Sequence, residues 1–168
     1  MNNELITLIA NLALTLSFIV ALVFGIAQVK AASRDRRERL TLDTIRSFQT
    51  REFAELALYI NNHDMPSTRE EMAALPAVEQ AILFQFAQQM ESLGILVAER
   101  LINIGLVDKT LGSFVTTSWE KYKILFTDIR VNQPDPFLGE YFQWLAEEIH
   151  HQMRINPRKP FYKKRGRF

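Results

Sequence analysis

The 168-residue chain contains no cysteine and only six glycines and six prolines. Without cysteine there is no disulfide, no thiol nucleophile and no cysteine-ligated metal. Runs of alternating β-branched residues are also missing, which argues against a β-sheet. No Walker or dinucleotide-binding glycine pattern occurs, and no serine lies in a Gly-x-Ser-x-Gly turn. We therefore expect an all-α protein that binds no cofactor and is not an enzyme.

One long stretch, Leu5 to Val29, carries no charge. A bilayer core about 30 Å thick needs roughly 20 helical residues, so this stretch can span a membrane with some tilt. A cleaved signal peptide is the alternative. It is disfavoured because Met1 to Glu4 has no basic side chain and the apolar run is longer than the core of a typical signal. The sequence predicts a transmembrane helix over residues 4–30.

Charge is distributed unevenly after this stretch. The net charge is +3 over residues 30–39, which we call the basic collar, −8 over residues 40–153 and +7 over residues 154–168. Basic residues beside a span stay on the cytoplasmic side of the membrane. The sequence therefore predicts a single-pass membrane protein with its N-terminus outside and its C-terminal body in the cytoplasm.

Small side chains recur every four residues along one face of the span. In lipid, helices associate through close backbone packing, which small side chains permit. Chance is the alternative, because such residues are common in membrane helices. We predict a homo-oligomer assembled through this small-residue ladder, which consists of Ala13, Ser17, Ala21 and Gly25.

Thr7, Asn11 and Thr15 form a polar row on the adjacent face, at the same spacing. Three interpretations stay open: hydrogen bonds between helices, the lining of a narrow pore, or threonine hydroxyls bonded to their own helix backbone. The last leaves only Asn11 in need of a partner. An oligomeric small channel or membrane-perturbing effector is thus the alternative to a membrane-anchored scaffold or interaction protein.

The rest of the chain has the apolar periodicity of amphipathic helices. No glycine or proline occurs between Ile26 and Met65, so the membrane helix is expected to continue through the collar into Leu40 to Asn61. We predict a bundle of four or five cytoplasmic helices over residues 31–155 and a flexible basic tail over residues 156–168. The other expected helices start at the capping-box pattern Ser67-Thr68-Arg69-Glu70 or cover Ala77 to Asn103, Leu111 to Val131 and Phe137 to Ile155.

Three residues have expected roles at helix ends or crossings. Gly94 is expected where two helices cross closely, because it lies inside a long apolar helix. Gly105 is expected as a C-cap and Asp108 as an N-cap of the following helix.

Four features occur in a recognisable order. They are the single N-terminal span, the segment Met90 to Val97, the segment Trp119 to Tyr122 on a helix that ends near Arg130, and the segment Phe142 to Ala146 after the prolines. In this order the chain resembles a family of bacterial membrane-anchored proteins known only as a domain of unknown function. The resemblance reaches to about Ile149. It implies an all-helical cytoplasmic body and no particular reaction.

The basic tail alternates cations with aromatic residues. For a protein tied to a membrane, anionic lipid headgroups are the nearest polyanion. Contact with a protein partner or a neighbouring subunit ranks second and a solvated tail third, while nucleic acid is disfavoured. The cations assigned to lipid or partner contact are Arg34, Arg36, Arg37 and Arg39 of the collar and Arg158, Lys159, Lys163, Lys164, Arg165 and Arg167 of the tail.

Two clusters have the composition of ligand sites. Glu147 to His151 contains the Glu-x-x-His spacing of di-iron bundles, which need a second copy and two further glutamates that are missing here. A solvated helix face is therefore the preferred interpretation. Aromatic residues at helical spacing are expected in the core rather than in a ligand cage, whereas Trp144 lies off the main apolar stripe and is expected to face a partner.

Overall fold

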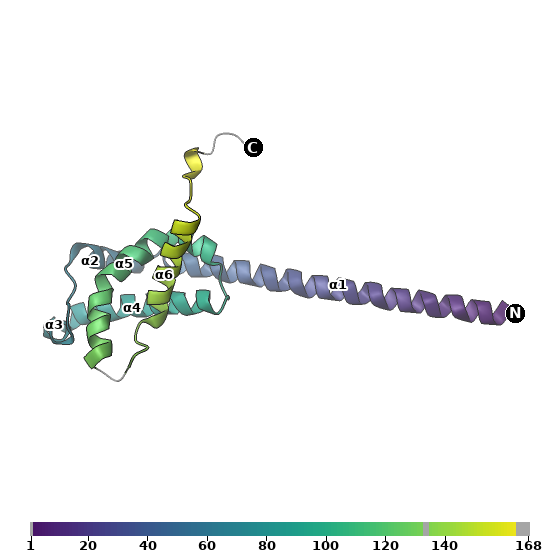
Figure 1. Cartoon of the computed structure of the whole chain (residues 1–168), viewed down its shortest axis with the longest axis horizontal. Coiled ribbons are helices and arrows are strands. Elements are labelled where there is room, and N and C mark those ends of the chain that lie inside the picture. The colour runs from purple at the N-terminus through teal and green to yellow at the C-terminus, as the bar shows by residue number, and fades with distance from the viewer. Residues whose placement is uncertain (1, 133–134, 164–168) are drawn as a thin grey trace. The chain divides into compact units, whose positions relative to one another are not determined.

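The computed structural model is entirely helical over the residues that it describes, 2–132 and 135–163, which confirms the predicted all-α class. Six α-helices are followed by one short 3-10 turn (Figure 1). The five helices after the first agree with the predicted four or five. The bounds are α1 Asn2–Ser47, α2 Arg51–Asn62, α3 Arg69–Ala74, α4 Ala77–Ala98, α5 Ile104–Asn132, α6 Glu140–Ile155 and η1 Phe161–Lys163.

The chain divides into two compact units, Met1–Arg39 and Leu40–Phe168. The first unit consists of the greater part of α1, and none of its described side chains is buried. The second unit, which we call the body, contains the last two turns of α1, helices α2 to α6 and the basic tail. Every residue that the structure describes as buried therefore belongs to the body.

Helix α1 continues through the collar as expected, but it ends at Ser47, so the expectation of one helix to Asn61 is wrong. Thr50 has an extended backbone, and its hydroxyl accepts a hydrogen bond from the amide of Phe53 at 3.2 Å. This N-cap satisfies an amide that has no partner inside α2. A threonine cap thus interrupts the helix without glycine or proline.

Helix α4 is central to the body. It packs against α2 and α6, while α6 also packs against α5, and α3 contacts α5. Figure 1 shows α6 lying across α4. The rings of Phe86, Tyr122 and Phe142 join these elements, with centroids 5.6–6.4 Å apart. Such aromatic pairs add stability beyond the area they bury.

Gly94 lies at the crossing of α4 and α6, as predicted. A Cβ atom at this position would be 2.3 Å from the carbonyl oxygen of Tyr141 and 2.6 Å from its carbonyl carbon. No side chain fits there, so glycine is what allows the two backbones to approach.

The turn between α4 and α5 differs from the predicted one. Helix α4 ends at Ala98 rather than at Asn103. Two residues after this end, Arg100 has a left-handed backbone conformation with a φ of 56°. The side chain of Asn103 accepts a hydrogen bond from the amide of Leu106 at 3.2 Å and so caps α5. Gly105 is therefore not a C-cap and Asp108 is not an N-cap, since both lie inside α5.

Two other helix starts are displaced from their predicted positions. Helix α6 starts at Glu140 rather than Phe137, because Gly139 has a φ of 68°. Before α3, the hydroxyl of Thr68 accepts from the amide of Glu71 at 3.2 Å, so the capping pattern is present one residue later than expected.

By length and composition, α1 and α4 are both candidates to cross a membrane. The most apolar part of α1 has a mean hydropathy of 2.4 and no buried residue, whereas that of α4 has 1.2 and is one-third buried. Helix α4 buries Leu83, Phe86 and Met90 in the body. It is a core helix, which leaves the N-terminal helix as the candidate span.

Candidate functional site

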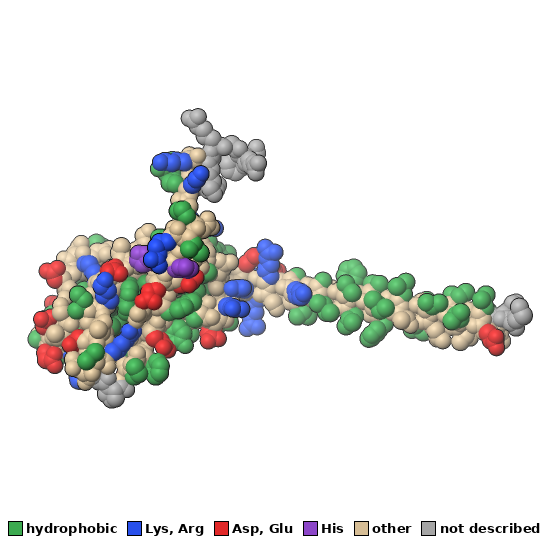
Figure 2. Space-filling view, in the orientation of Figure 1, with side chains coloured by type: hydrophobic (Ala, Val, Ile, Leu, Met, Phe, Trp, Pro, Cys, Tyr) green, Lys and Arg blue, Asp and Glu red, His purple; other side chains and the backbone are tan. Residues whose placement is uncertain are grey.

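The apolar segment of α1 is exposed along its whole length. Every large apolar side chain from Leu5 to Val29 is 47–69% exposed. Figure 2 shows hydrophobic side chains along this part of the helix, followed by Lys and Arg side chains at the basic collar. Burying one such side chain stabilises a protein by about 1.5–3 kcal/mol, so a fully exposed apolar helix is disfavoured in water. The segment is therefore expected in an apolar surrounding rather than in water.

The small-residue ladder forms an open strip on this segment. Ala13, Ser17, Ala21 and Gly25 are all exposed, and a Cβ atom at Gly25 would have nothing within 4 Å. No contact within the chain therefore requires glycine at position 25. The strip is available to a second helix.

The threonines of the polar row bond to their own helix. The Thr7 hydroxyl donates to the carbonyl of Asn3 at 2.9 Å, and the Thr15 hydroxyl donates to the carbonyl of Asn11 at 2.8 Å. This geometry matches the local interpretation, which leaves Asn11 as the member of the row that needs a partner.

The cations assigned to lipid or partner contact differ in their surroundings. Arg36, Arg39, Lys159 and Lys163 are exposed, and so are Arg34 and Arg37. Arg34 pairs with Glu38 at 2.9 Å, whereas Lys163 lies 5.9 Å from the ring centre of Tyr162. Lys164, Arg165 and Arg167 lie outside the described residues.

Arg158 is bound within its own body. Its Nη2 atom donates to the Oδ1 atom and the backbone carbonyl of Asp108, both at 3.1 Å. Asp108 is only 7% exposed, and a Cβ atom at Gly112 would lie 2.5 Å from its carboxylate. Glycine at position 112 thus leaves room for the Asp108 carboxylate. Arg158 is bound to this carboxylate and is not free to contact lipid.

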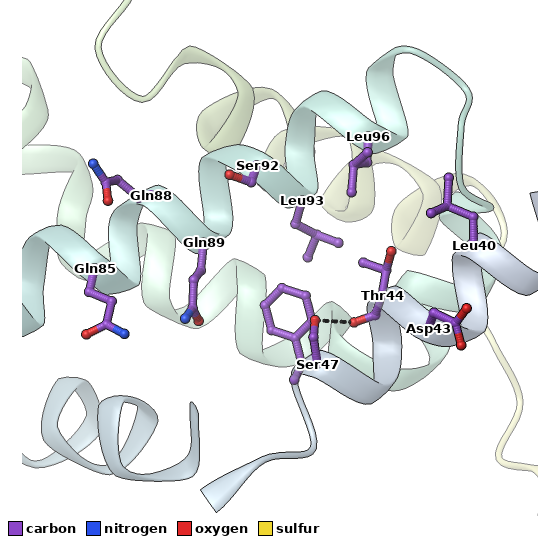
Figure 3. Close-up of a pocket in the computed structure, with 11 residues that line it drawn as sticks. Leu40, Asp43, Thr44, Ser47, Gln85, Gln88, Gln89, Ser92, Leu93 and Leu96 are labelled. Carbon is purple, nitrogen blue, oxygen red and sulfur yellow. Dashed lines mark hydrogen bonds between the residues drawn. The ribbon is translucent and has the colours of Figure 1, made fainter. Parts of the chain in front are cut away.

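A groove of about 620 Å³ runs between the end of α1 and α4 (Figure 3). Leu40, Phe48, Leu93 and Leu96 form its apolar part. Gln85 and Gln89 extend from α4 on the same side, whereas Gln88 points the other way. The Ser47 hydroxyl donates a hydrogen bond to the carbonyl of Thr44 at 2.6 Å, within its own helix. The groove contains no constellation of catalytic side chains.

The Glu147 to His151 cluster forms a solvated helix face. Glu147 accepts from Gln143 at 2.7 Å and Glu148 accepts from Gln152 at 2.9 Å, while both histidines are exposed. Within the described residues, no three His, Asp or Glu side chains come together in a way that would hold a metal ion.

The predicted aromatic residues lie in the core. Trp119, Tyr122, Phe126 and Phe142 are buried, and Trp144 is 38% exposed. Burial raises the pKa of Tyr122, whose hydroxyl donates to the carbonyl of Leu83 at 2.9 Å. The rings pack against one another in the core, as Tyr122 does against Phe126 with ring centroids 5.5 Å apart.

Tyr59 is the other tyrosine with an altered acidity. Its hydroxyl donates to the carboxylate of Glu79 at 2.6 Å, and this hydrogen bond raises the pKa of Tyr59 to about 12. The pair joins α2 to the first turn of α4, which makes its role structural.

Charged side chains that the sequence left without a role cap the helices of the body. The Glu91 carboxylate accepts from the amides of Tyr141 at 3.2 Å and Phe142 at 2.8 Å, which caps the start of α6. Lys121 donates to the carbonyls of Ile60 at 2.6 Å and Asn61 at 2.9 Å, which caps the end of α2. Both charges have the sign that favours the helix dipole at that end.

Arg130 ties the end of α5 to the start of α6. Its Nε atom donates to the carbonyl of Leu138 at 2.8 Å, and its Nη1 atom donates to the side chain of Gln143 at 2.6 Å. Glu91, Lys121 and Arg130 lie in or beside the segments that carry the family resemblance. Those segments therefore hold the helices together.

Fold and geometry define an all-helical protein that joins an exposed apolar helix to a helical body. Residues 15–149 match the family described as Domain of unknown function (DUF4760), and because this match covers most of the chain, the protein belongs to that family. The matched region extends from within the apolar segment of α1 to α6. No curated protein and no solved structure matches the chain.

Proposed function

We propose that this protein is a membrane-anchored scaffold of the bacterial inner membrane. In this account residues 4–30 span the bilayer, self-associate through the small-residue ladder and hold the helical domain predicted over residues 31–155 in the cytoplasm. The observation that carries the proposal is the apolar segment of α1, whose large side chains are all 47–69% exposed. A bilayer would supply an apolar surrounding for these exposed side chains.

The flanking charges support this placement. The collar carries a net charge of +3 directly after the apolar segment, whereas only Glu4 precedes it. Basic residues near an anionic membrane surface contribute about 1 kcal/mol each. The exposed collar cations and Lys159 and Lys163 of the tail would contact lipid, and a protein partner is the second candidate for the tail.

Topology can be tested directly because the chain has no cysteine. We expect that Asn3→Cys, at the N-terminus, reacts with a membrane-impermeant maleimide added outside intact spheroplasts. Glu99→Cys, at an exposed position of the body, is expected to react only after the membrane is opened. The reverse pattern, or reaction of both cysteines from outside, would contradict the placement.

Self-association can be tested on the ladder. Ser17→Leu with Gly25→Leu adds bulk to the strip, so we expect light scattering in detergent to show a lower particle mass than for the wild type. The matched control is Ile19→Leu with Val23→Leu, which changes the opposite face and is expected to keep the wild-type mass. An unchanged mass in the ladder variant would show that the strip does not assemble the protein.

A channel is the alternative function. It would need the polar row to face a lumen, and the Thr7 and Thr15 hydroxyls bonded to backbone carbonyls give it little support. Conductance of the purified protein in liposomes, lost on Asn11→Leu, would favour the channel over the scaffold.

A further inference from the structure

A second cavity lies inside the body, between α3, α4, α5 and the residues that lead into α6. Its volume is about 240 Å³. Leu83, Tyr122 and Leu125 line it and are at most 2% exposed. Phe84 also lines it and is 55% exposed, so the cavity opens to the surface beside this ring. Protein interiors are close-packed, so an apolar pocket that reaches from the surface to buried side chains leaves some of their contacts unfilled.

The cavity wall offers few free polar groups. The Tyr122 hydroxyl is already bonded to the carbonyl of Leu83, and the Glu91 carboxylate is already bonded to the first amides of α6. Among the residues that the structure describes, no Lys, Arg or His lines the cavity, and the remaining polar lining residue, Gln88, is exposed. With so few free polar groups on its wall, the cavity favours an apolar ligand over an ion.

We propose that this cavity binds the end of a hydrocarbon chain. The volume exceeds the roughly 150 Å³ of an engineered apolar cavity that takes up benzene. A linear chain can enter beside Phe84 and restore the contacts that the lining side chains lack. Its polar end stays outside the cavity, whose described lining residues include no cation. The proposal does not depend on the scaffold function.

This chemistry predicts recognition of the chain without recognition of the head group. Decanol and decanoate are therefore expected to bind with affinities within about threefold of each other, and affinity is expected to fall as the chain is shortened. A tenfold preference for decanoate would contradict the proposal, because it would require a cation that the wall does not contain.

The decisive test is photolabelling of the full chain in lipid nanodiscs. One sample receives decanol with a photoreactive group at the end of its chain, and a second has a phospholipid with the same group at the end of one acyl chain. We expect mass spectrometry to find the label in α4 near Phe84 or in α5 near Leu125. Labelling by decanol alone identifies a free chain as the ligand, and labelling by the phospholipid as well identifies a bilayer lipid.

Ala87→Leu provides the matched variant, because Ala87 lines the cavity and leucine would fill it. Labelling is expected to fall at least tenfold in this variant and to stay unchanged in Ala81→Leu, an exposed position of the same helix. Excess unlabelled decanol is expected to abolish the label in the wild type, which tests the site without a substitution. Labelling that resists this competition, or no label on the lining residues in either sample, would overturn the proposal.

Discussion

Gly94→Ala places a methyl group where α4 and α6 cross. The new Cβ would be 2.3 Å from the Tyr141 oxygen, and real Cβ contacts are not shorter than 3.0 Å, so the helices must separate by about 0.7 Å. Overpacking of this kind costs about 1–3 kcal/mol. The separation also stretches the bonds of Glu91 to the amides of Tyr141 and Phe142, and hydrogen bonds to charged groups contribute about 1.5–3 kcal/mol. We expect a total loss of about 3 kcal/mol.

The loss can be measured by thermal unfolding of the full chain in detergent, followed by tryptophan fluorescence. Both tryptophans, Trp119 and Trp144, belong to the body, so the signal reports on its unfolding. At about 2–4 °C per kcal/mol, Tm is expected to fall by about 6–12 °C. Gly25→Ala is the control, because nothing lies within 4 Å of its Cβ, and the Tm of the body should not change. A Gly94→Ala variant within about 0.5 kcal/mol of the wild type would refute the close crossing.

Three further predictions concern contacts within the body. Glu91→Gln weakens the cap of α6 and is expected to cost about 1–2 kcal/mol in urea unfolding, whereas Glu99→Gln, at an exposed position, should cost nothing measurable. Lys121→Met removes the cap of α2 and is expected to lower the free energy of unfolding by about 1–2 kcal/mol. Proteolysis of the loop after α2 is expected to become faster, and an unchanged rate would argue against the cap. The raised pKa of Tyr59, about 12, means that its contribution to stability is complete below pH 10 and is lost as pH rises toward 12. Tyr59→Phe should therefore reduce the alkaline loss of stability, with Tyr122 contributing the rest, and an identical pH profile for the variant would contradict this assignment.

Apolar periodicity was sufficient to predict the helices of the body but not their ends. Gly94 was predictable because a glycine inside a long apolar helix needs a packing reason. The ends depend on single caps and backbone angles instead. Thr50 and Asn103 start helices with a side-chain hydrogen bond, and Gly139 delays α6 through a positive φ. Such local choices compete closely with helix continuation, so periodicity alone does not resolve them.

The candidate sites also differ in how far the sequence alone predicts them. The exposed apolar helix follows from the length and lack of charge of Leu5 to Val29, properties that need no knowledge of the fold. The bonds of Glu91 to α6 and of Arg158 to Asp108 connect residues 50 or more positions apart. Only the packed body brings those partners together. Sequence alone therefore placed Arg158 among the cations for lipid or partner contact, whereas in the structure it binds Asp108.

The central claim is that the apolar segment of α1 holds the protein in a membrane, and alkaline extraction of isolated membranes tests it most directly. The wild type is expected to stay in the membrane pellet. Replacing Leu14, Phe18 and Leu22 with lysine adds about 2.5–3.5 kcal/mol per charge to the cost of insertion, so this variant is expected in the supernatant. Extraction of the wild-type chain into the alkaline supernatant would contradict the account.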